Sequence, residues 1–373
     1  MPDVFAAAGD LLREAVEARV FPAASVEVGS TADVRWSAAA GAHTYDPYAT
    51  FTKPGTIFDL ASLTKAIATT TLAMRAVDDG RLRLDDRVAS WLAEWRGTDR
   101  EIVTIRDLLA HSAGLSAYLP FFRDQTGRQE FQREICTLRL EYAPRTQSIY
   151  SDLGFILLGF ILEDAASAVP GSAGLPGTVD PAASLAAQFQ RISSFVTNEP
   201  LTFNPPRAWR PQTAPTEIDP WRGRLLTGEV HDENAWALGG AAGHAGLFGT
   251  APAVGAFARA VMRTLAGERV VSEPGTLRDF VRRTAVPGSS RALGWDTMKP
   301  TSSCGTRLSP SAIGHTGYTG TSLWIDWERD FYVVLLSNRV HPTRDNDAIR
   351  QFRPRFHDAV VDAIERLQSR VRP

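Results

Sequence analysis

The chain has 373 residues, 44% of them hydrophobic, so it can bury a large core and exceeds the size at which single cores usually stop growing. Its 40 basic and 42 acidic side chains leave a formal net charge of -2, which excludes an electrostatic argument for binding nucleic acid or anionic lipid. We therefore expect one large domain, or two closely packed ones, that acts on a small, near-neutral molecule.

The beginning of the chain predicts a helix followed by two strands. Apolar residues recur at helical spacing over residues 4–20, and a Phe-Pro pair ends the pattern. Residues 25–29 and 34–38 then have strand character, and the four polar and small residues between them predict a hairpin turn.

The middle of the chain predicts helices. Residues 62–79 are apolar nearly all round, and Gly80 follows where a helix C-cap would stand, which indicates a core helix. Shorter helical patterns follow at 88–95, at 105–110 with Thr104 as N-cap, at 152–166 and at 253–265, without a comparable strand among them. Stretches rich in Pro, Gly or irregular sequence, at 169–181 and 198–220, predict loops that shape a substrate site.

Strand character returns near the end of the chain. Residues 320–326 and 331–338 predict a hairpin, and residues 345–367 predict a terminal helix. We therefore predict an α/β plus all-α fold, in which early and late strands share one antiparallel sheet flanked by the N- and C-terminal helices. The predicted domains are an α/β domain (1–80 and 235–373) and an inserted, mainly helical domain (81–234), with the active site in the cleft between them.

The first chemical candidate is Ser62 with Lys65, at the start of the predicted core helix. Residues three apart share a helix face, so the Lys65 amine can reach the Ser62 hydroxyl. A serine hydroxyl needs a neighbouring base to act as a nucleophile, and a helix N-terminus supplies N–H groups to a developing oxyanion. The alternative is a buried serine beside a core lysine, but only three lysines stand among the 40 basic residues, so a Lys here is informative.

Two further elements complete a pattern: Tyr150-Ser151-Asp152 at the start of a predicted helix, and His315-Thr316-Gly317 before a predicted strand. With the Ser-x-x-Lys element, the chain resembles the penicillin-binding protein and class C β-lactamase family of serine hydrolases, which includes esterases and D-amino-acid peptidases. The stretches 104–115, 228–235 and 243–248 also look like this family. The resemblance covers roughly residues 20–340, and three elements in the right order are far more specific than one.

The resemblance implies a division of roles. Ser62 attacks a carbonyl carbon, Lys65 and Tyr150 handle its proton, and the backbone N–H groups of Ser62 and Tyr318 form the oxyanion hole. The sequence leaves open whether Lys65 or Tyr150 is the base. It implies a small ester or amide as substrate, bound with the help of Asp152, His315, Thr316 and Gly317.

Two residues depart from the family pattern. Asp152 replaces the usual Asn and removes an amide donor, and we expect it instead to pair with Lys65 and keep it cationic, which would make Tyr150 the base. His315 replaces a lysine, and a neutral imidazole binds a β-lactam carboxylate more weakly than an ammonium does. An esterase or peptidase is therefore favoured. A D-alanyl-D-alanine carboxypeptidase or weak β-lactamase, an acyltransferase, and a non-catalytic ligand-binding relative are the alternatives.

The remaining polar residues receive structural interpretations. His111 and His244 stand in turn-like sequence where an imidazole commonly binds loop backbone, and the His231-Asp232-Glu233 run lacks a partner at ligand spacing, so we predict no metal and no cofactor. Cys136 and Cys304 match no zinc or redox motif. Because the chain as given shows neither a leader nor a membrane-spanning stretch of roughly 20 apolar residues, we expect a cytoplasmic protein that does not enter the membrane.

Overall fold

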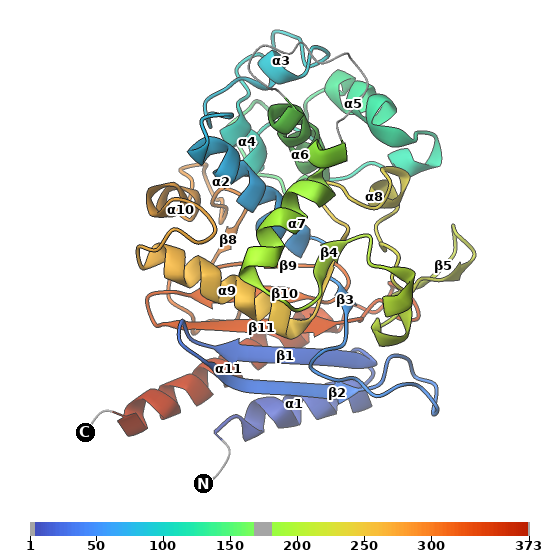
Figure 1. The fold of residues 1–373 in the computed structure, drawn as a ribbon, viewed down its shortest axis with the longest axis vertical. Helices are drawn as coiled ribbons and strands as arrows, with labels where there is room; N and C mark the ends of the chain where they lie inside the picture. The colour runs from blue at the N-terminus through green and yellow to red at the C-terminus, as the bar shows by residue number, and fades with distance from the viewer. Residues whose placement is uncertain (1–3, 168–180, 372–373) are drawn as a thin grey trace.

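A six-stranded antiparallel sheet forms the lower part of the molecule in the computed structural model, which describes residues 4–167 and 181–371 (Figure 1). Its strand order is β2-β1-β11-β10-β9-β8. The strands are β1 (Ala23–Gly29), β2 (Val34–Gly41), β8 (Asp296–Thr297), β9 (Ile313–Thr316), β10 (Ser322–Asp326) and β11 (Phe331–Ser337). The sheet therefore joins strands from the two ends of the chain, as the sequence predicts.

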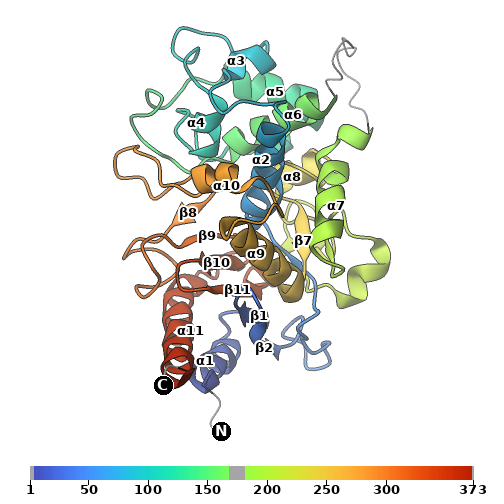
Figure 2. The ribbon, with the colours of Figure 1, turned by 60° about the vertical axis from the view of Figure 1, so that its left-hand side comes forward.

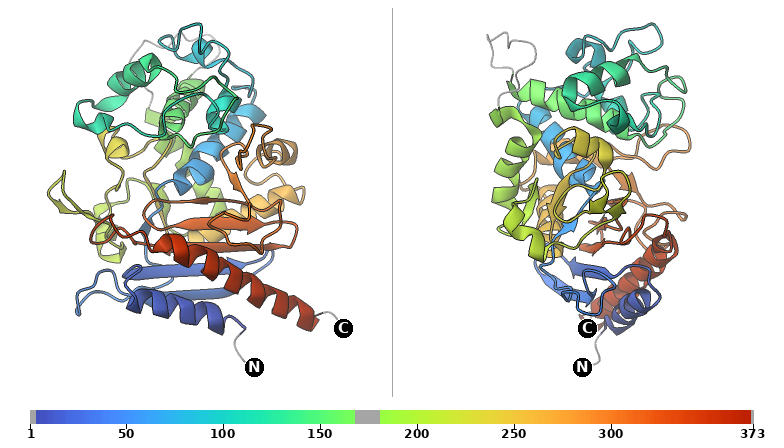
Figure 3. Two further views of the ribbon diagram at one scale, coloured as in Figure 1. Left: turned by 180° about the vertical axis from the view of Figure 1, so that it is seen from behind. Right: turned by 90° about the vertical axis from the view of Figure 1, so that its right-hand side faces the viewer.

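Helices cover both faces of this sheet. α1 (Ala6–Glu17) and α11 (Ile349–Val371) lie on one face, and α9 (Ala251–Leu265) lies on the other (Figure 3). Every residue of the central strands β1 and β11 is buried, because neither face of these strands is open to water. Two-sided burial accounts for the near-continuous apolar sequence of β11.

Most of the other helices form a cluster above the sheet, seen from a second direction in Figure 2. α6 (Asp152–Ser167) lies at its centre, and its nearly all-round apolar surface is buried against the neighbouring helices. The remaining helices and helical turns are η1 (Lys65–Thr69, a π-helical turn), α2 (Thr70–Asp78), α3 (Val88–Trp91), α4 (Ile105–Leu109), η2 (Phe121–Arg123), α5 (Gly127–Thr137), η3 (Pro181–Ala183), α7 (Leu185–Val196), η4 (Arg207–Gln212), α8 (Glu233–Ala237) and α10 (Pro274–Phe280). None of the helices within 4–167 and 181–371 combines the length and apolar character needed to cross a bilayer.

Two small sheets are separate from the large one. One has the order β3-β7-β4, and the other pairs β5 with β6. Their strands are β3 (Phe58–Asp59), β4 (Leu201–Phe203), β5 (Ile218–Asp219), β6 (Arg224–Leu225) and β7 (Leu247–Gly249). β3 immediately precedes Ser62, and the amide of Leu60 donates to the carbonyl of Leu247 at 2.9 Å, so pairing with β7 fixes where the nucleophile segment begins.

The structure confirms the predicted fold class and corrects several elements. The expectation of a strand-free middle is wrong, because β4 to β7 lie there. The helix expected over 62–79 is a π-helical turn followed by α2, the helix expected at 88–95 ends at Trp91, and α5, α7 and α10 were not predicted. The domain boundaries stay a prediction, and residues 169–180 of the loop expected at 169–181 lie outside the described residues.

Candidate active site

The segment before Ser62 is held in an unusual backbone conformation. Ala61 has a φ of 47°, a left-handed value that a residue with a side chain rarely adopts. The buried carboxylate of Asp59 supports it, because it accepts hydrogen bonds from the amides of Ala61 at 2.8 Å and His231 at 2.7 Å. Burial raises the pKa of Asp59 despite these two amide donors. The result is a sharp turn that presents Ser62 at the start of the helical segment.

Lys65 lies one turn after Ser62 and is completely buried. Its Nζ atom contacts Ser62 Oγ at 3.1 Å, the carbonyl oxygen of His244 at 2.9 Å and Asp152 Oδ1 at 2.6 Å. An ammonium has three donors and no acceptor, and here it donates to Ser62 and His244 while the contact with Asp152 is an ion pair. Lys65 therefore stands as an ammonium that donates to Ser62.

The charge of Lys65 depends on Asp152. Burial alone would lower the pKa of Lys65, but the negative charge of Asp152 and the contacts with Tyr150 outweigh burial and raise it. Asp152 is the first residue of α6, where a carboxylate is also favoured by the helix dipole. The expected pairing of Asp152 with Lys65 is present in the structure.

Tyr150 comes from the segment that leads into α6 and lies beside both residues of the Ser-Lys pair. Burial raises the pKa of its phenol, the Lys65 ammonium and the Ser62 hydroxyl lower it, and the charge of Asp152 raises it further, with a net increase. His111 fixes this segment, because its Nδ1 accepts the amide hydrogen of Ser151 at 3.1 Å and its ring packs against Tyr150 at 4.7 Å. Burial keeps the pKa of His111 well below its usual value, so its ring is neutral and able to accept.

His315 lies on β9, opposite Tyr150, with the two ring centroids 5.8 Å apart. Its Nδ1 lies 2.9 Å from the carbonyl oxygen of Thr316, which can only accept, so Nδ1 carries the hydrogen. Burial holds the pKa of His315 well below its ordinary value, so the ring is neutral and Nε2 is an acceptor. Nε2 is buried without a hydrogen-bond partner among the described residues. His315 therefore brings no positive charge to the site.

The end of β9 approaches the nucleophile segment closely. A Cβ atom on Gly317 would lie 2.5 Å from the carbonyl oxygen of Leu60, so only glycine allows this approach. The hydroxyl of Thr321 donates to the same carbonyl at 3.0 Å. Within the part of the chain that the structure describes, the amide N–H groups of Ser62 and Tyr318 donate to no protein acceptor, as an oxyanion hole requires.

A cavity of about 530 Å³ opens over Ser62. All the predicted site residues except Lys65, which lies behind Ser62, line it: Ser62, Tyr150, Asp152, His315, Thr316, Gly317 and Tyr318. The structure thus brings together residues separated by more than 250 positions in the sequence, and that volume is in the range of small-molecule sites.

Buried arginines line the far wall of the same cavity. Arg353 donates to the carbonyl oxygens of Gly317 and Thr321, each at 2.9 Å, and its Nε atom has no partner among the described residues. Burial and the charge of Arg339 lower the pKa of Arg353 to about 9. Arg339 donates to the carbonyl oxygen of Tyr318 at 2.8 Å and lies over its ring. Positive charge therefore lies against the Gly317–Tyr318 backbone.

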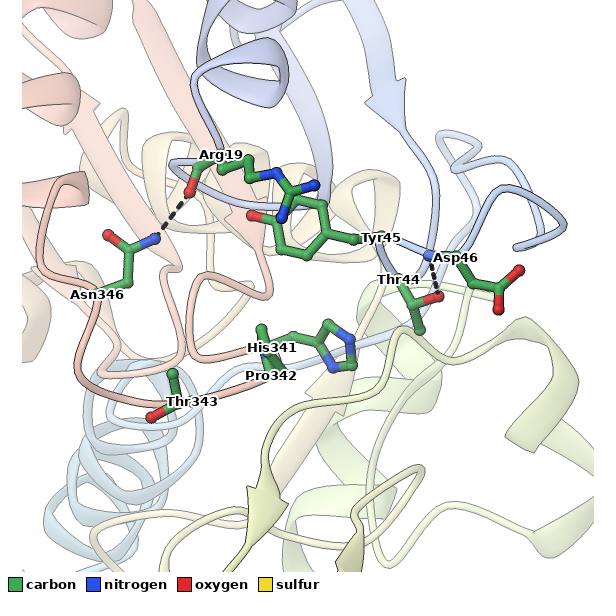
Figure 4. Close-up of a pocket in the computed structure, with 8 residues that line it drawn as sticks. All are labelled: Arg19, Thr44, Tyr45, Asp46, His341, Pro342, Thr343 and Asn346. Atoms are coloured by element: carbon green, nitrogen blue, oxygen red, sulfur yellow. Dashed lines mark hydrogen bonds between the residues drawn. The ribbon is translucent and has the colours of Figure 1, made fainter.

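A second cavity, of about 610 Å³, shares no lining residue with the cavity over Ser62 and is shown in Figure 4. Arg19 lies over the ring of Tyr45 there, 4.9 Å from its centroid, and burial raises the pKa of Tyr45 to about 12. The residues lining it are Arg19, Thr44, Tyr45, Asp46, His341, Pro342, Thr343 and Asn346, which contain no serine and no lysine. This cavity does not contain the Ser-Lys chemistry.

Some residues that organise the site were missed or undervalued from the sequence. Asp59 was not considered, although it fixes both Ala61 and His231. His111 and His244 were given loop roles, yet His111 fixes the Tyr150 segment and the His244 carbonyl binds Lys65. His244 is itself held by Asp232 at 2.8 Å, and that interaction counters burial and lowers the pKa of Asp232. For His111, Asp232 and His244, the signal in the sequence was the family resemblance of the stretches 104–115, 228–235 and 243–248.

Comparison with known proteins gives two kinds of match. A relative from Salmonella gallinarum is 30% identical over 321 residues, covers 77% of this chain and 70% of its own length, and carries the provisional name D-alanyl-D-alanine carboxypeptidase. A relative from Escherichia coli with the same provisional name is 29% identical over 328 residues, with the same coverage of both chains.

Solved structures share the fold. A hydrolase with promiscuous acyltransferase activity, EstCE1, has a TM-score of 0.74 at 20% identity over 96% of this chain and 98% of its own. The octameric penicillin-binding protein homologue from Pyrococcus abyssi has a TM-score of 0.68 at 18% identity over 89% of this chain and 73% of its own. The Beta-lactamase family model matches residues 9–354. With that match over nearly its whole length, the chain belongs to the beta-lactamase family of serine hydrolases.

Proposed function

We propose that this protein hydrolyses an ester or amide through an acyl-enzyme on Ser62. The observation that carries the proposal is the arrangement around the Lys65 ammonium, which donates to Ser62 and His244 and pairs with the carboxylate of Asp152, while Tyr150 lies beside the Ser-Lys pair. Because Lys65 already donates to Ser62, it has no lone pair with which to take the serine proton. Tyr150 is therefore the proposed base, and because its pKa is raised, we expect activity to increase with pH as the phenol ionises.

The proposed reaction has two balanced steps. In the first, Ser62 Oγ bonds to the substrate carbonyl carbon, its proton passes by way of Tyr150 to the leaving group, and the bond to the leaving group breaks. In the second, water attacks the acyl carbon, its proton returns through Tyr150 to Ser62 Oγ, and the acid is released. The amides of Ser62 and Tyr318 would stabilise the oxyanion in both steps.

Simple esters suit this site better than β-lactams do. At position 152 a carboxylate replaces an amide donor, and it is committed to Lys65 at 2.6 Å. His315 is neutral, its Nδ1 hydrogen is bound to the Thr316 carbonyl and its Nε2 is buried, so it offers a carboxylate neither charge nor an accessible donor. Both features weaken recognition of a penicillin at the positions where a family member with Asn and Lys would bind it.

The buried arginines favour a second candidate, a D-alanyl carboxypeptidase. A free peptide carboxylate would find unpaired positive charge at Arg339 and Arg353, and a buried cation without a counter-charge is costly until one binds. The provisional name of the relatives points the same way.

The deciding experiment measures p-nitrophenyl acetate hydrolysis by the wild-type chain and by Ser62→Ala. We expect turnover in the wild type and background in the variant, with an acetyl group added to Ser62 in mass spectra. Equal rates in both chains would refute the proposal. D-alanine release from an acyl-D-alanyl-D-alanine peptide, abolished by the same substitution, would favour the peptidase. Faster ester turnover on adding an alcohol, with ester product formed, would favour an acyltransferase.

A further inference from the structure

An exposed aromatic cluster lies beside the cavity and has no part in the proposed chemistry. Trp221 and Trp236 are 42% and 40% exposed, and their rings meet edge to face with centroids 5.3 Å apart. Phe122 meets Trp221 in the same way at 4.6 Å. Grouped aromatic rings left in contact with water commonly mark a binding surface, because a ligand that covers them removes apolar area from water. We call Phe122, Trp221 and Trp236 the aromatic platform.

Arg222 lies against both Trp rings of the platform. Its side chain is 2% exposed and forms an ion pair with Asp219, and its guanidinium carbon lies 5.9 Å from the ring centroids of Trp221 and of Trp236. The same guanidinium donates to the carbonyl oxygen of His231 at 2.6 Å. Because His231 lines the cavity, Arg222 ties the platform directly to the cavity wall.

The platform is also continuous with the cavity along α8. Glu233 lines the cavity, and Trp236 follows it by three residues, so the two side chains share one face of that helical turn. The side-chain oxygen of Asn234 accepts the amide hydrogen of Phe122 at 2.9 Å, which holds the third ring against α8. The aromatic rings therefore extend the cavity wall outward from Glu233.

Two of the charges beside the Trp pair are neutralised. Arg222 pairs with Asp219, and Glu233 pairs with Arg344 at 2.8 Å. The guanidinium carbon of Arg123 lies 5.8 Å from the ring centroid of Phe122 and forms no ion pair among the described residues, so positive charge stands at that edge of the platform, whereas the Trp221–Trp236 pair offers aromatic ring surface. The Trp221–Trp236 side of the platform therefore favours an apolar group.

We propose that the aromatic platform binds an extended alkyl or aryl arm of the substrate, whose carbonyl group reaches Ser62. The assignment rests on the proposed hydrolase function and narrows it to substrates that carry such an arm. Continuity with the cavity makes the enzyme's own substrate the occupant, and not a separate protein partner.

The test compares kcat/KM for p-nitrophenyl hexanoate and p-nitrophenyl acetate. In a Trp221→Ala/Trp236→Ala double variant, the hexanoate-to-acetate ratio should fall about tenfold, the size expected from losing apolar contact with part of an alkyl chain. Phe195→Ala is the matched control, because Phe195 is an aromatic residue 90% exposed on α7, which does not line the cavity. Its ratio should equal that of the wild type. An unchanged ratio in the double variant, or an equal fall in the control, would overturn the proposal.

A binding measurement separates failure of the platform from failure of the proposed function. Calorimetry with p-nitrophenyl hexanoate is run on Ser62→Ala with and without the two Trp substitutions, and thermal unfolding confirms that each chain folds. Weaker binding without the Trp pair supports the platform even if the wild type hydrolyses neither ester, and equal or absent binding in both chains overturns it. If the double variant does not fold, Trp236→Gln replaces it, since this side chain is 40% exposed.

Discussion

Replacing Asp152 with Asn tests the charge balance around Lys65. The carboxylate lies 2.6 Å from Nζ, the Lys65 side chain is wholly buried, and that of Asp152 is 17% exposed. Removing one partner of a buried ion pair costs about 3–5 kcal/mol, and the partial exposure of Asp152 puts the expected loss of unfolding free energy at about 3 kcal/mol. Asn keeps the shape of the side chain, so the loss measures charge and not volume.

The same substitution changes the pH dependence in a definite direction. The negative charge of Asp152 raises the pKa of both Lys65 and Tyr150, so its removal lowers both. The rise of kcat/KM with pH should therefore move to lower pH. Because Lys65 also loses one of its three acceptors, the plateau of kcat/KM should fall by about tenfold, the size of one hydrogen bond to a charged group.

The pH dependence of the unfolding free energy tests the same ion pair independently. Since the folded-state pKa of Lys65 is raised, the pair stabilises the wild type below the ordinary lysine pKa of about 10.4, and this stability is lost as the pH rises through the folded value. The deficit of Asp152→Asn should thus be full at neutral pH and narrow in strong alkali.

The assay is p-nitrophenyl acetate hydrolysis across the neutral and alkaline range, with urea unfolding of the same samples. Glu27→Gln is the control, because Glu27 is 4% exposed and pairs with Arg259 at 3.0 Å in the contact between β1 and α9. It should lose stability while its pH profile stays that of the wild type. An unchanged pH profile in Asp152→Asn would refute the role assigned to this carboxylate.

Three further predictions follow from single contacts. Tyr150→Phe should lower kcat by at least about 100-fold with little change in KM, because it removes an acid–base group. Steady-state ester hydrolysis measures both constants. Burial would raise the pKa of Glu217, but hydrogen bonds from His231 and Arg344 lower it to about 2. The wild type should therefore lose stability between the ordinary glutamate pKa of about 4.3 and pH 2, and Glu217→Gln should not show this loss in acid unfolding. Thr104→Ala removes the capping box of α4, and urea unfolding should show a loss of about 1 kcal/mol.

The sequence predicted what depends on local spacing. Ser62 and Lys65 stand three positions apart, and the helical contact between them follows from that spacing alone. The capping residue Thr104 was likewise predicted from its position before an apolar run, and the structure shows the capping box. The late hairpin was also predicted from two runs with strand character around a short turn, and the structure pairs β10 with β11.

Contacts between distant segments could not be predicted in the same way. The carbonyl oxygen that binds Lys65 belongs to His244, 179 positions away, and a backbone carbonyl has no sequence signature. Gly243 beside it is required because a Cβ atom there would lie 2.0 Å from the carbonyl oxygen of Phe155, which is a property of how the loop packs on α6. The π-helical turn at Lys65 was missed for a similar reason, because its apolar composition also suits an α-helix.

The two departures from the family pattern act together on the electrostatics of the site. Asp152 adds a negative charge where Asn is neutral, and His315 removes the positive charge of a lysine, so the centre near Ser62 is two charge units more negative than in a member with both usual residues. Arg339 and Arg353 supply positive charge of the same size, but behind the Gly317–Tyr318 backbone. An anionic substrate would therefore be drawn to the arginines, away from His315. A neutral ester pays no such electrostatic penalty, and for that reason the charge distribution favours a neutral group next to the scissile bond.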